Sequence, residues 1–154
     1  MRFIILYILL FAVTFNINAQ ETPQQKEQAD SLWDLFYHYN FVHNYDSAMF
    51  YGDQFLKNRI KYGTISQAIE AYNHKIKSLK RFNKLNEAFR LTLNTYDNYC
   101  RGNFDAIECE KCYIINNQLA EFMIKLRDYR QGLSYINNSC NPESSEWSFY
   151  VKAK

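Results

Sequence analysis

A short pattern of bulky, polar and small residues occurs three times along the chain. Each copy has a large residue, two polar residues, a small residue and then alternating bulky positions. Two antiparallel helices can approach closely only where one of them lacks a large side chain, so the small residue is the informative position. The copies lie at residues 45–51, 85–91 and 129–135, their small residues are Ala48, Ala88 and Gly132, and they follow polar breaks at 43–44, 83–84 and 127–128.

Apolar residues between these breaks recur at the three- and four-residue spacing of helices that bury one face. In the first stretch, Leu32, Leu35, Phe36, Tyr39 and Val42 fall on one stripe. We therefore predict helices at about residues 30–42, 46–59, 66–82, 87–99, 105–126 and 129–138. We expect a short side-chain oxygen, from Asp46 or Ser47, to cap the start of the second helix.

Helices joined by such short breaks predict an all-α fold of antiparallel helical hairpins. Residues 30–140 hold about three hairpins, and the polar segment 20–29 is expected to be a flexible N-terminus. Residues 141–154 are predicted to start a further helix, which either continues the repeats or caps the last hairpin.

The arrangement of bulky and small residues is similar to a known repeat. Leu35, Phe36 and Tyr39 with Ala48 fit the pattern in the first unit, and Leu119, Ala120 and Met123 with Gly132 fit it in the third. In the second unit Ala88 fits, but Lys75 stands where an apolar residue is usual. This pattern resembles the tetratricopeptide repeat family, although the small residues here are 40 and 44 positions apart, against a usual period of about 34.

The resemblance implies a short right-handed solenoid of stacked hairpins that binds another protein or a peptide. The chain also looks similar to exported sensor regions of signalling proteins in Bacteroides-like bacteria, which have degenerate repeats rich in Tyr and Asn. That similarity implies the sensor fragment of a longer signalling protein. No nucleic-acid partner is expected, because 18 basic and 16 acidic residues give a formal charge of only +2.

The first residues have the organisation of a signal peptide. Met1 and Arg2 form a short positive region, and residues 3–15 are an apolar run too short for a typical membrane span. Ala19 supplies a small residue at the expected cleavage site, so residues 1–19 are predicted to be removed on export to the periplasm or beyond. An uncleaved anchor is the alternative, and no stable membrane span is expected after cleavage.

Four cysteines in an exported chain suggest disulfide bonds. The hairpin arrangement gathers Cys100, Cys109, Cys112 and Cys140 at one end of the stack. Counting the helical rise from the turn near residues 127–128 places Cys112 and Cys140 at similar heights, with Cys109 nearer to Cys100. We therefore expect the pairs Cys100–Cys109 and Cys112–Cys140.

Two sharper interpretations of the cysteines compete with this one. Cys109 and Cys112 have the spacing of a redox pair near a helix start, which predicts a periplasmic thiol–disulfide protein. However, the strand that precedes such a site in thioredoxin-like folds is absent from the pattern. A four-cysteine zinc site is the other possibility, but a second pair with this spacing is missing.

No other cluster predicts catalysis or a cofactor. Asp34 and His38 have a spacing that could share a metal, but no third ligand lies nearby in the sequence, so a surface hydrogen bond or ion pair is the simpler interpretation. Motifs for zinc hydrolysis, phosphate binding and nucleophilic catalysis are lacking. A basic run is interpreted as a solvated helix face rather than an anion site; it comprises Lys75, Lys77, Lys80, Arg81 and Lys84.

These observations favour an exported, non-enzymatic helical-repeat scaffold with no cofactor. Its partner is expected to be a protein or peptide, since aromatic residues make up 18% of the chain and dominate binding hot spots. The alternative function is thiol–disulfide exchange through Cys109 and Cys112.

Overall fold

The computed structural model describes residues 21–102 and 106–137, without the side chains of residues 106–110. Within these ranges the chain is helical apart from short connections, and no strand is present, so the predicted all-α class is confirmed. The helices are α2 (Pro23–Phe41), α3 (Tyr45–Tyr62), α4 (Ile65–Arg81), α5 (Leu85–Thr95), α6 (Ala106–Lys125) and α7 (Tyr129–Asn137), and a π-helical turn, η1 (Tyr96–Cys100), extends α5.

The predicted signal peptide at residues 1–19 and the predicted further helix at 141–154 lie outside the described residues. None of the helices in the described ranges has the length and apolar composition needed to cross a lipid bilayer.

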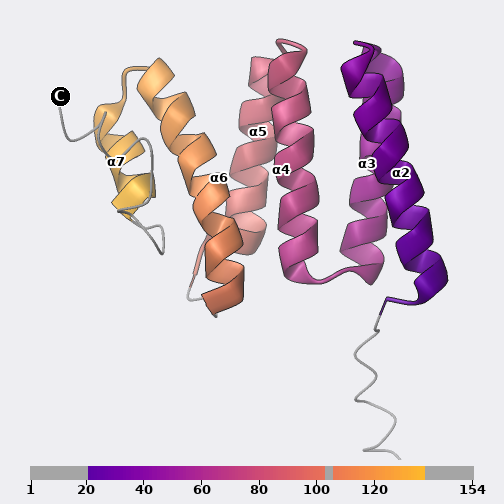
Figure 1. The fold of residues 1–154 in the computed structure, drawn as a ribbon. Coiled ribbons are helices and arrows are strands. Elements are labelled where there is room, and N and C mark those ends of the chain that lie inside the picture. The colour runs from indigo at the N-terminus through magenta and orange to yellow at the C-terminus, as the bar shows by residue number, and fades with distance from the viewer. Residues whose placement is uncertain (1–20, 103–105, 138–154) are drawn as a thin grey trace, which may run out of the picture.

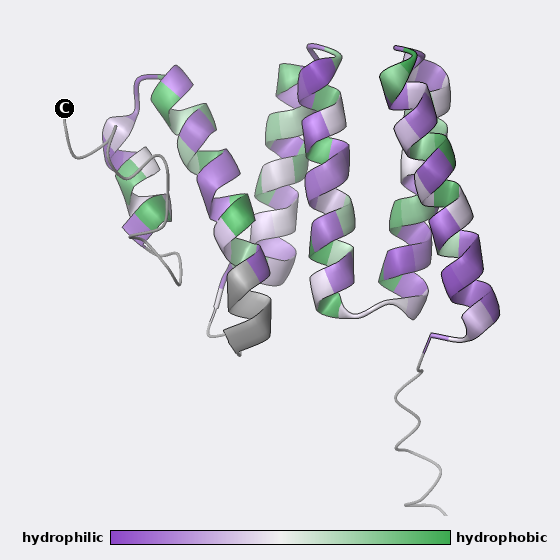
Figure 2. Cartoon of the chain, in the orientation of Figure 1, coloured by the Kyte–Doolittle hydropathy of each residue, from purple (hydrophilic) through white to green (hydrophobic). Residues whose placement is uncertain are grey.

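Consecutive helices pack as antiparallel pairs that stand side by side in a row (Figure 1). The pairs are α2 with α3, α4 with α5, and α6 with α7. Helix α4 lies in the middle of the row, because it also contacts α3 of the first pair and α6 of the third. Each helix carries apolar and polar residues along its length, so it can bury one side and expose another (Figure 2).

The three hairpin turns share one backbone geometry. His43, Asn83 and Arg127 have φ angles of 57°, 59° and 63°, in the left-handed region. In every turn the next amide donates to a carbonyl five residues earlier, with N···O distances of 3.0 Å for Asn44 to Tyr39, 2.8 Å for Lys84 to Leu79 and 2.9 Å for Asp128 to Met123. This hydrogen bond belongs to the Schellman motif that ends many helices. We call His43, Asn83 and Arg127 the turn residues.

The small residue predicted from the sequence stands five positions after each turn residue. Ala48 and Ala88 are completely buried, and Gly132 is buried as well. Each therefore lies where the returning helix passes closest to its partner. Sequence reasoning missed a second close approach at Gly52, where an added Cβ would lie 2.9 Å from the ring of Phe36.

The remaining residues expected at the repeat interfaces have different environments. Phe36, Leu119 and Ala120 are buried. Tyr39 is half-buried and stacks on Tyr51 of α3, with ring centroids 5.3 Å apart. Leu35 does not pack as expected and is 38% exposed.

The first helix starts earlier than predicted. Residues 23–29 belong to α2, so the expectation of a flexible segment over 20–29 is wrong for these residues. Thr22 and Gln25 form a reciprocal capping box, in which the Thr22 hydroxyl accepts from the Gln25 amide and the Gln25 side chain accepts from the Thr22 amide. Ala29 is completely buried, and Arg59 of α3 pairs with Glu21 at 2.7 Å.

The start of α3 is also capped differently from the prediction. Asn44, rather than Asp46 or Ser47, is the cap, and its side-chain oxygen accepts a hydrogen bond of 3.1 Å from the Ser47 amide. The cap immediately follows the turn residue His43, so one short segment both ends α2 and starts α3.

Buried polar side chains join the first helices of neighbouring hairpins. Ser78 donates a hydrogen bond to Asn40, whose amide donates to the Phe36 carbonyl at 2.8 Å. Between α4 and α6, Gln118 donates to Asn73 at 3.2 Å. Buried polar groups are costly unless paired, so these contacts favour one register between adjacent hairpins.

Replacing a turn residue by glycine should stabilise the fold. We expect Arg127→Gly to raise the free energy of unfolding by roughly 0.5–1 kcal/mol, because glycine adopts positive φ without steric cost. Asn83→Gly should raise the free energy of unfolding by a smaller amount, because asparagine already tolerates this conformation. Urea unfolding monitored by circular dichroism measures both changes.

Lys57→Gly is the control for this prediction. Lys57 is exposed within α3, so glycine at this position should lower the free energy of unfolding by about 1 kcal/mol. A loss of stability for Arg127→Gly would contradict a left-handed residue at this turn.

Candidate functional site

Equivalent positions in the three hairpins can be compared because their turns share one geometry. Leu35, Lys75 and Leu119 each stand eight residues before a turn residue. Leu119 is completely buried, as a residue between stacked hairpins should be. Leu35 is exposed because, within the described residues, no hairpin precedes α2 to cover it. Lys75 is the exception, since a charged residue occupies the junction between the first and second hairpins.

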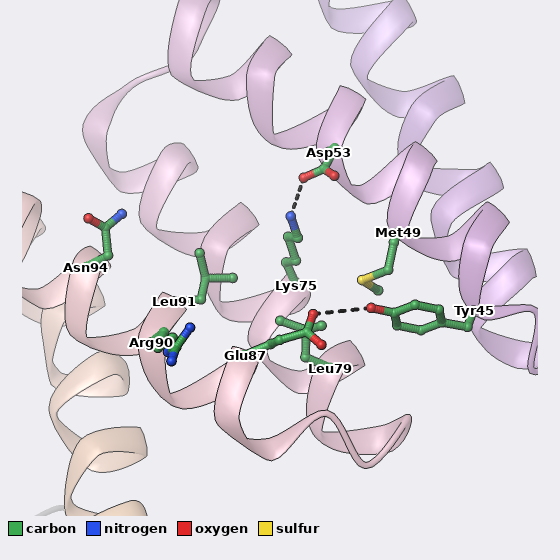
Figure 3. A pocket seen from close by; sticks show the side chains of 9 residues that line it. All are labelled: Tyr45, Met49, Asp53, Lys75, Leu79, Glu87, Arg90, Leu91 and Asn94. Atoms are coloured by element: carbon green, nitrogen blue, oxygen red, sulfur yellow. Dashed lines mark hydrogen bonds and ion pairs between the residues drawn. The ribbon is translucent and has the colours of Figure 1, made fainter.

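Lys75 lines a pocket of about 420 Å³ at this junction (Figure 3). We call it the inter-hairpin pocket. Its residues come from three helices: Tyr45, Met49 and Asp53 from α3, Lys75 and Leu79 from α4, and Glu87, Arg90, Leu91 and Asn94 from α5. The three- and four-residue spacing within α3 and α5 places each set on one helix face.

Two polar contacts cross the inter-hairpin pocket (Figure 3). Lys75 forms an ion pair with Asp53 of the preceding hairpin. The Tyr45 hydroxyl donates to a Glu87 carboxylate oxygen over 3.3 Å. Burial raises the pKa of Tyr45, and the negative charge of Glu87 raises it further, so the phenol stays protonated and remains a donor. Polar contacts therefore join the first and second hairpins. At the junction between the second and third hairpins, the position equivalent to Lys75 is the buried Leu119.

The inter-hairpin pocket also holds groups that are available to a ligand. Arg90 is exposed and forms no ion pair with any described residue. Asn94, one turn further along α5, is exposed as well. Met49, Leu79 and Leu91 give the pocket an apolar part. The two acidic and two basic side chains balance in charge, so this site can bind a mixed polar and apolar group rather than a strongly charged one.

The disulfide differs from the expected pairing. Cys100 is bonded to Cys112, so Cys100 does not pair with Cys109 and Cys112 does not pair with Cys140. The helical-rise estimate failed because Cys100 ends the π-helical turn η1, which packs against α6 at the level of Cys112. The side chains of Cys109 and Cys140 lie outside the described residues.

The side chains of the predicted basic run have different partners. Lys75 pairs with Asp53, Lys80 pairs with Glu121 of α6, and the Lys84 ammonium lies 5.0 Å from the centre of the Tyr45 ring. Lys77 is exposed and has no partner among the described residues. The run is therefore not one continuous basic surface.

The described residues contain no group of three or more side chains of the types that hold a metal ion. Asp34 and His38 are both exposed on α2, and the His38 ring lies 5.2 Å from that of Tyr39.

Comparisons with protein-family models, with curated proteins and with solved structures give no match for this chain.

Removing the disulfide should weaken the fold. The bond closes a loop with a sequence separation of 12, so Cys100→Ser with Cys112→Ser should lower the free energy of unfolding by about 3 kcal/mol. Peptide mapping without reductant should recover a fragment that links Cys100 to Cys112, and Cys109→Ser should leave this linkage intact. A fragment that links Cys100 to Cys109 would contradict the structure.

Placing lysine at position 119 and leucine at position 75 should change the free energy of unfolding by very different amounts. Leu119→Lys buries an unpaired charge and should cost about 3–5 kcal/mol of unfolding free energy. Lys75→Leu removes a partly exposed ion pair at the edge of a pocket and should change the same quantity by less than about 1 kcal/mol. Thermal and urea unfolding measure the difference. Equal losses in the two variants would show that Lys75 is needed for stability rather than for an open pocket.

Proposed function

We propose that the protein is an exported helical-repeat scaffold, related in design to tetratricopeptide repeats, that binds a protein or peptide partner. The observation that carries this proposal is the inter-hairpin pocket, where a polar junction containing Lys75 remains open to solvent. The equivalent position in the third hairpin, Leu119, is closed by an apolar side chain. A repeat protein that needed only stability would favour the apolar residue at both junctions.

The chemistry of the pocket suits a peptide. Arg90 and Asn94 can donate hydrogen bonds to main-chain carbonyls or carboxylates, and Glu87 can accept from amides. Met49 and Leu91 offer apolar contact for one side chain, and methionine adapts well to varied partners.

The relation to tetratricopeptide repeats is supported by the recurrence of one turn geometry at residues 43, 83 and 127. The buried small residues at the same distance after each turn support it as well. Export to the periplasm or beyond rests on the leader sequence, and a role as the sensor part of a longer signalling protein rests on the resemblance to such regions.

Thiol–disulfide exchange through Cys109 and Cys112 is the less favoured function. Cys112 is bonded to Cys100 instead, and both sulfur-bearing residues are buried. A redox pair needs a reactive thiol that its substrate can reach.

Selection from a displayed library of random peptides tests the scaffold function. We expect peptides that bind the wild-type protein, and we expect Arg90→Glu to weaken their binding about tenfold, because it reverses the one unpaired cation of the pocket. Lys75→Leu should weaken binding while leaving the fold intact. Isothermal titration of the selected peptides measures both effects.

Arg130→Glu is the matched control, because it makes the same charge change at an exposed arginine of α7, and no residue of α7 lines the pocket. Binding that is equally sensitive to Arg130→Glu would reject the pocket as the site. The protein for this experiment is recovered after expression of the full chain, and its absence from the periplasmic fraction would reject the exported location.

A further inference from the structure

A second concave site lies between the first helices of neighbouring hairpins. It has a volume of about 230 Å³ and is lined by Trp33, Tyr37 and Asn40 of α2 and by His74, Lys77 and Arg81 of α4. We call it the α2–α4 cleft. Lys75 and Leu79 of α4 line the inter-hairpin pocket instead, so the two sites occupy different sides of one helix.

The floor of the α2–α4 cleft is a cluster of rings around Trp33. The ring centroid of Trp33 lies 4.4 Å from that of His74, 5.8 Å from that of Phe36 and 6.1 Å from that of Tyr37. Asn40 and Ser78 also line the cleft, and the Ser78 hydroxyl donates to the Asn40 side chain, which joins α4 to α2. The cleft therefore presents an aromatic surface built from both helices.

The charge of the cleft is positive and is not compensated within its lining. Lys77 and Arg81 stand one turn apart on α4, and no acidic residue lines the cleft. Lys77 has no partner in the described part of the chain, and the Arg81 guanidinium has only the His43 imidazole, at 3.4 Å. Burial lowers the pKa of His74, so its ring is neutral at neutral pH and the positive charge comes from the two longer side chains.

From this combination of rings and cations, we propose that the α2–α4 cleft binds an acidic side chain and an adjacent aromatic side chain of a partner peptide. The volume fits one or two side chains and excludes a folded domain. The aromatic ring would lie against Trp33, and the carboxylate would be held by Lys77 and Arg81. Two cations in a recess are too few for stable attachment to an anionic membrane, which needs a longer basic cluster. This site goes beyond the inter-hairpin pocket, and its occupation does not depend on that pocket.

Trp33 provides a direct probe of the cleft. The chain contains two tryptophans, so Trp147→Phe leaves Trp33 as the single indole reporter. The ligand is a blocked peptide of alternating glutamate and phenylalanine, and the matched control is the same peptide with glutamine in place of glutamate. We expect a saturable change in Trp33 emission with the acidic peptide alone, and about tenfold weaker binding when Lys77→Glu and Arg81→Glu are combined.

Further variants separate this proposal from the proposed function. Arg90→Glu lies in the inter-hairpin pocket and should leave the Trp33 titration unchanged, while circular dichroism confirms that each variant is folded. Equal binding of the glutamine peptide would overturn the proposal, as would a titration that is lost in Arg90→Glu. A response to vesicles of anionic phospholipid equal to that with the acidic peptide would also overturn it, in favour of a lipid surface.

Discussion

The left-handed residue at each hairpin turn fixes how the two helices of that hairpin meet. It stops one helix at a fixed position, and the returning helix then starts within two residues. Because the return path is fixed, the residue five positions later always meets the preceding helix at close range, and only alanine or glycine occupies it here. One local backbone geometry thus sets the approach of the two helices in all three hairpins.

Once the turns are equivalent, the differences between hairpins lie in the side chains at matched positions. The junction between the second and third hairpins contains Leu119, which is completely buried. The junction between the first and second contains Lys75, which needs both a counter-charge and some access to water. Asp53 supplies the counter-charge, and the inter-hairpin pocket supplies the access. The pocket is therefore a consequence of one charged residue in an otherwise apolar repeat position.

The sequence predicted the helices and their turns well, because helical periodicity and polar breaks are local signals. The predicted start of α2 was too late, because residues 20–29 are mostly polar and show no helical period, whereas the helix is started by the capping box of Thr22 and Gln25. The disulfide was mispredicted because a π-helical turn is not visible in an apolar pattern, and it changes where Cys100 points.

Neither concave site could be predicted from the sequence, because each brings together side chains that are far apart in the chain. Asp53 and Lys75 are 22 residues apart, and Asn40 and Ser78 are 38 residues apart. The one available signal was Lys75, a charged residue at a position where the other two hairpins have leucine. This position alone does not predict the partner Asp53 or the pocket around both residues, because these depend on how α3, α4 and α5 are arranged in space.

Helix α4 contributes residues to both sites. Successive residues of a helix point in different directions, so neighbours in the sequence can line different sites. His74 and Lys75 are adjacent in the chain, yet one lines the α2–α4 cleft and the other lines the inter-hairpin pocket. The basic run that looked like a single solvated face is thus divided between a paired cation in one site and two largely uncompensated cations in the other. Helix α4 contacts α3, α5 and α6, so its position is fixed by neighbouring helices of all three hairpins. Both sites are therefore built on a preorganised element, which lowers the entropy lost when a partner binds.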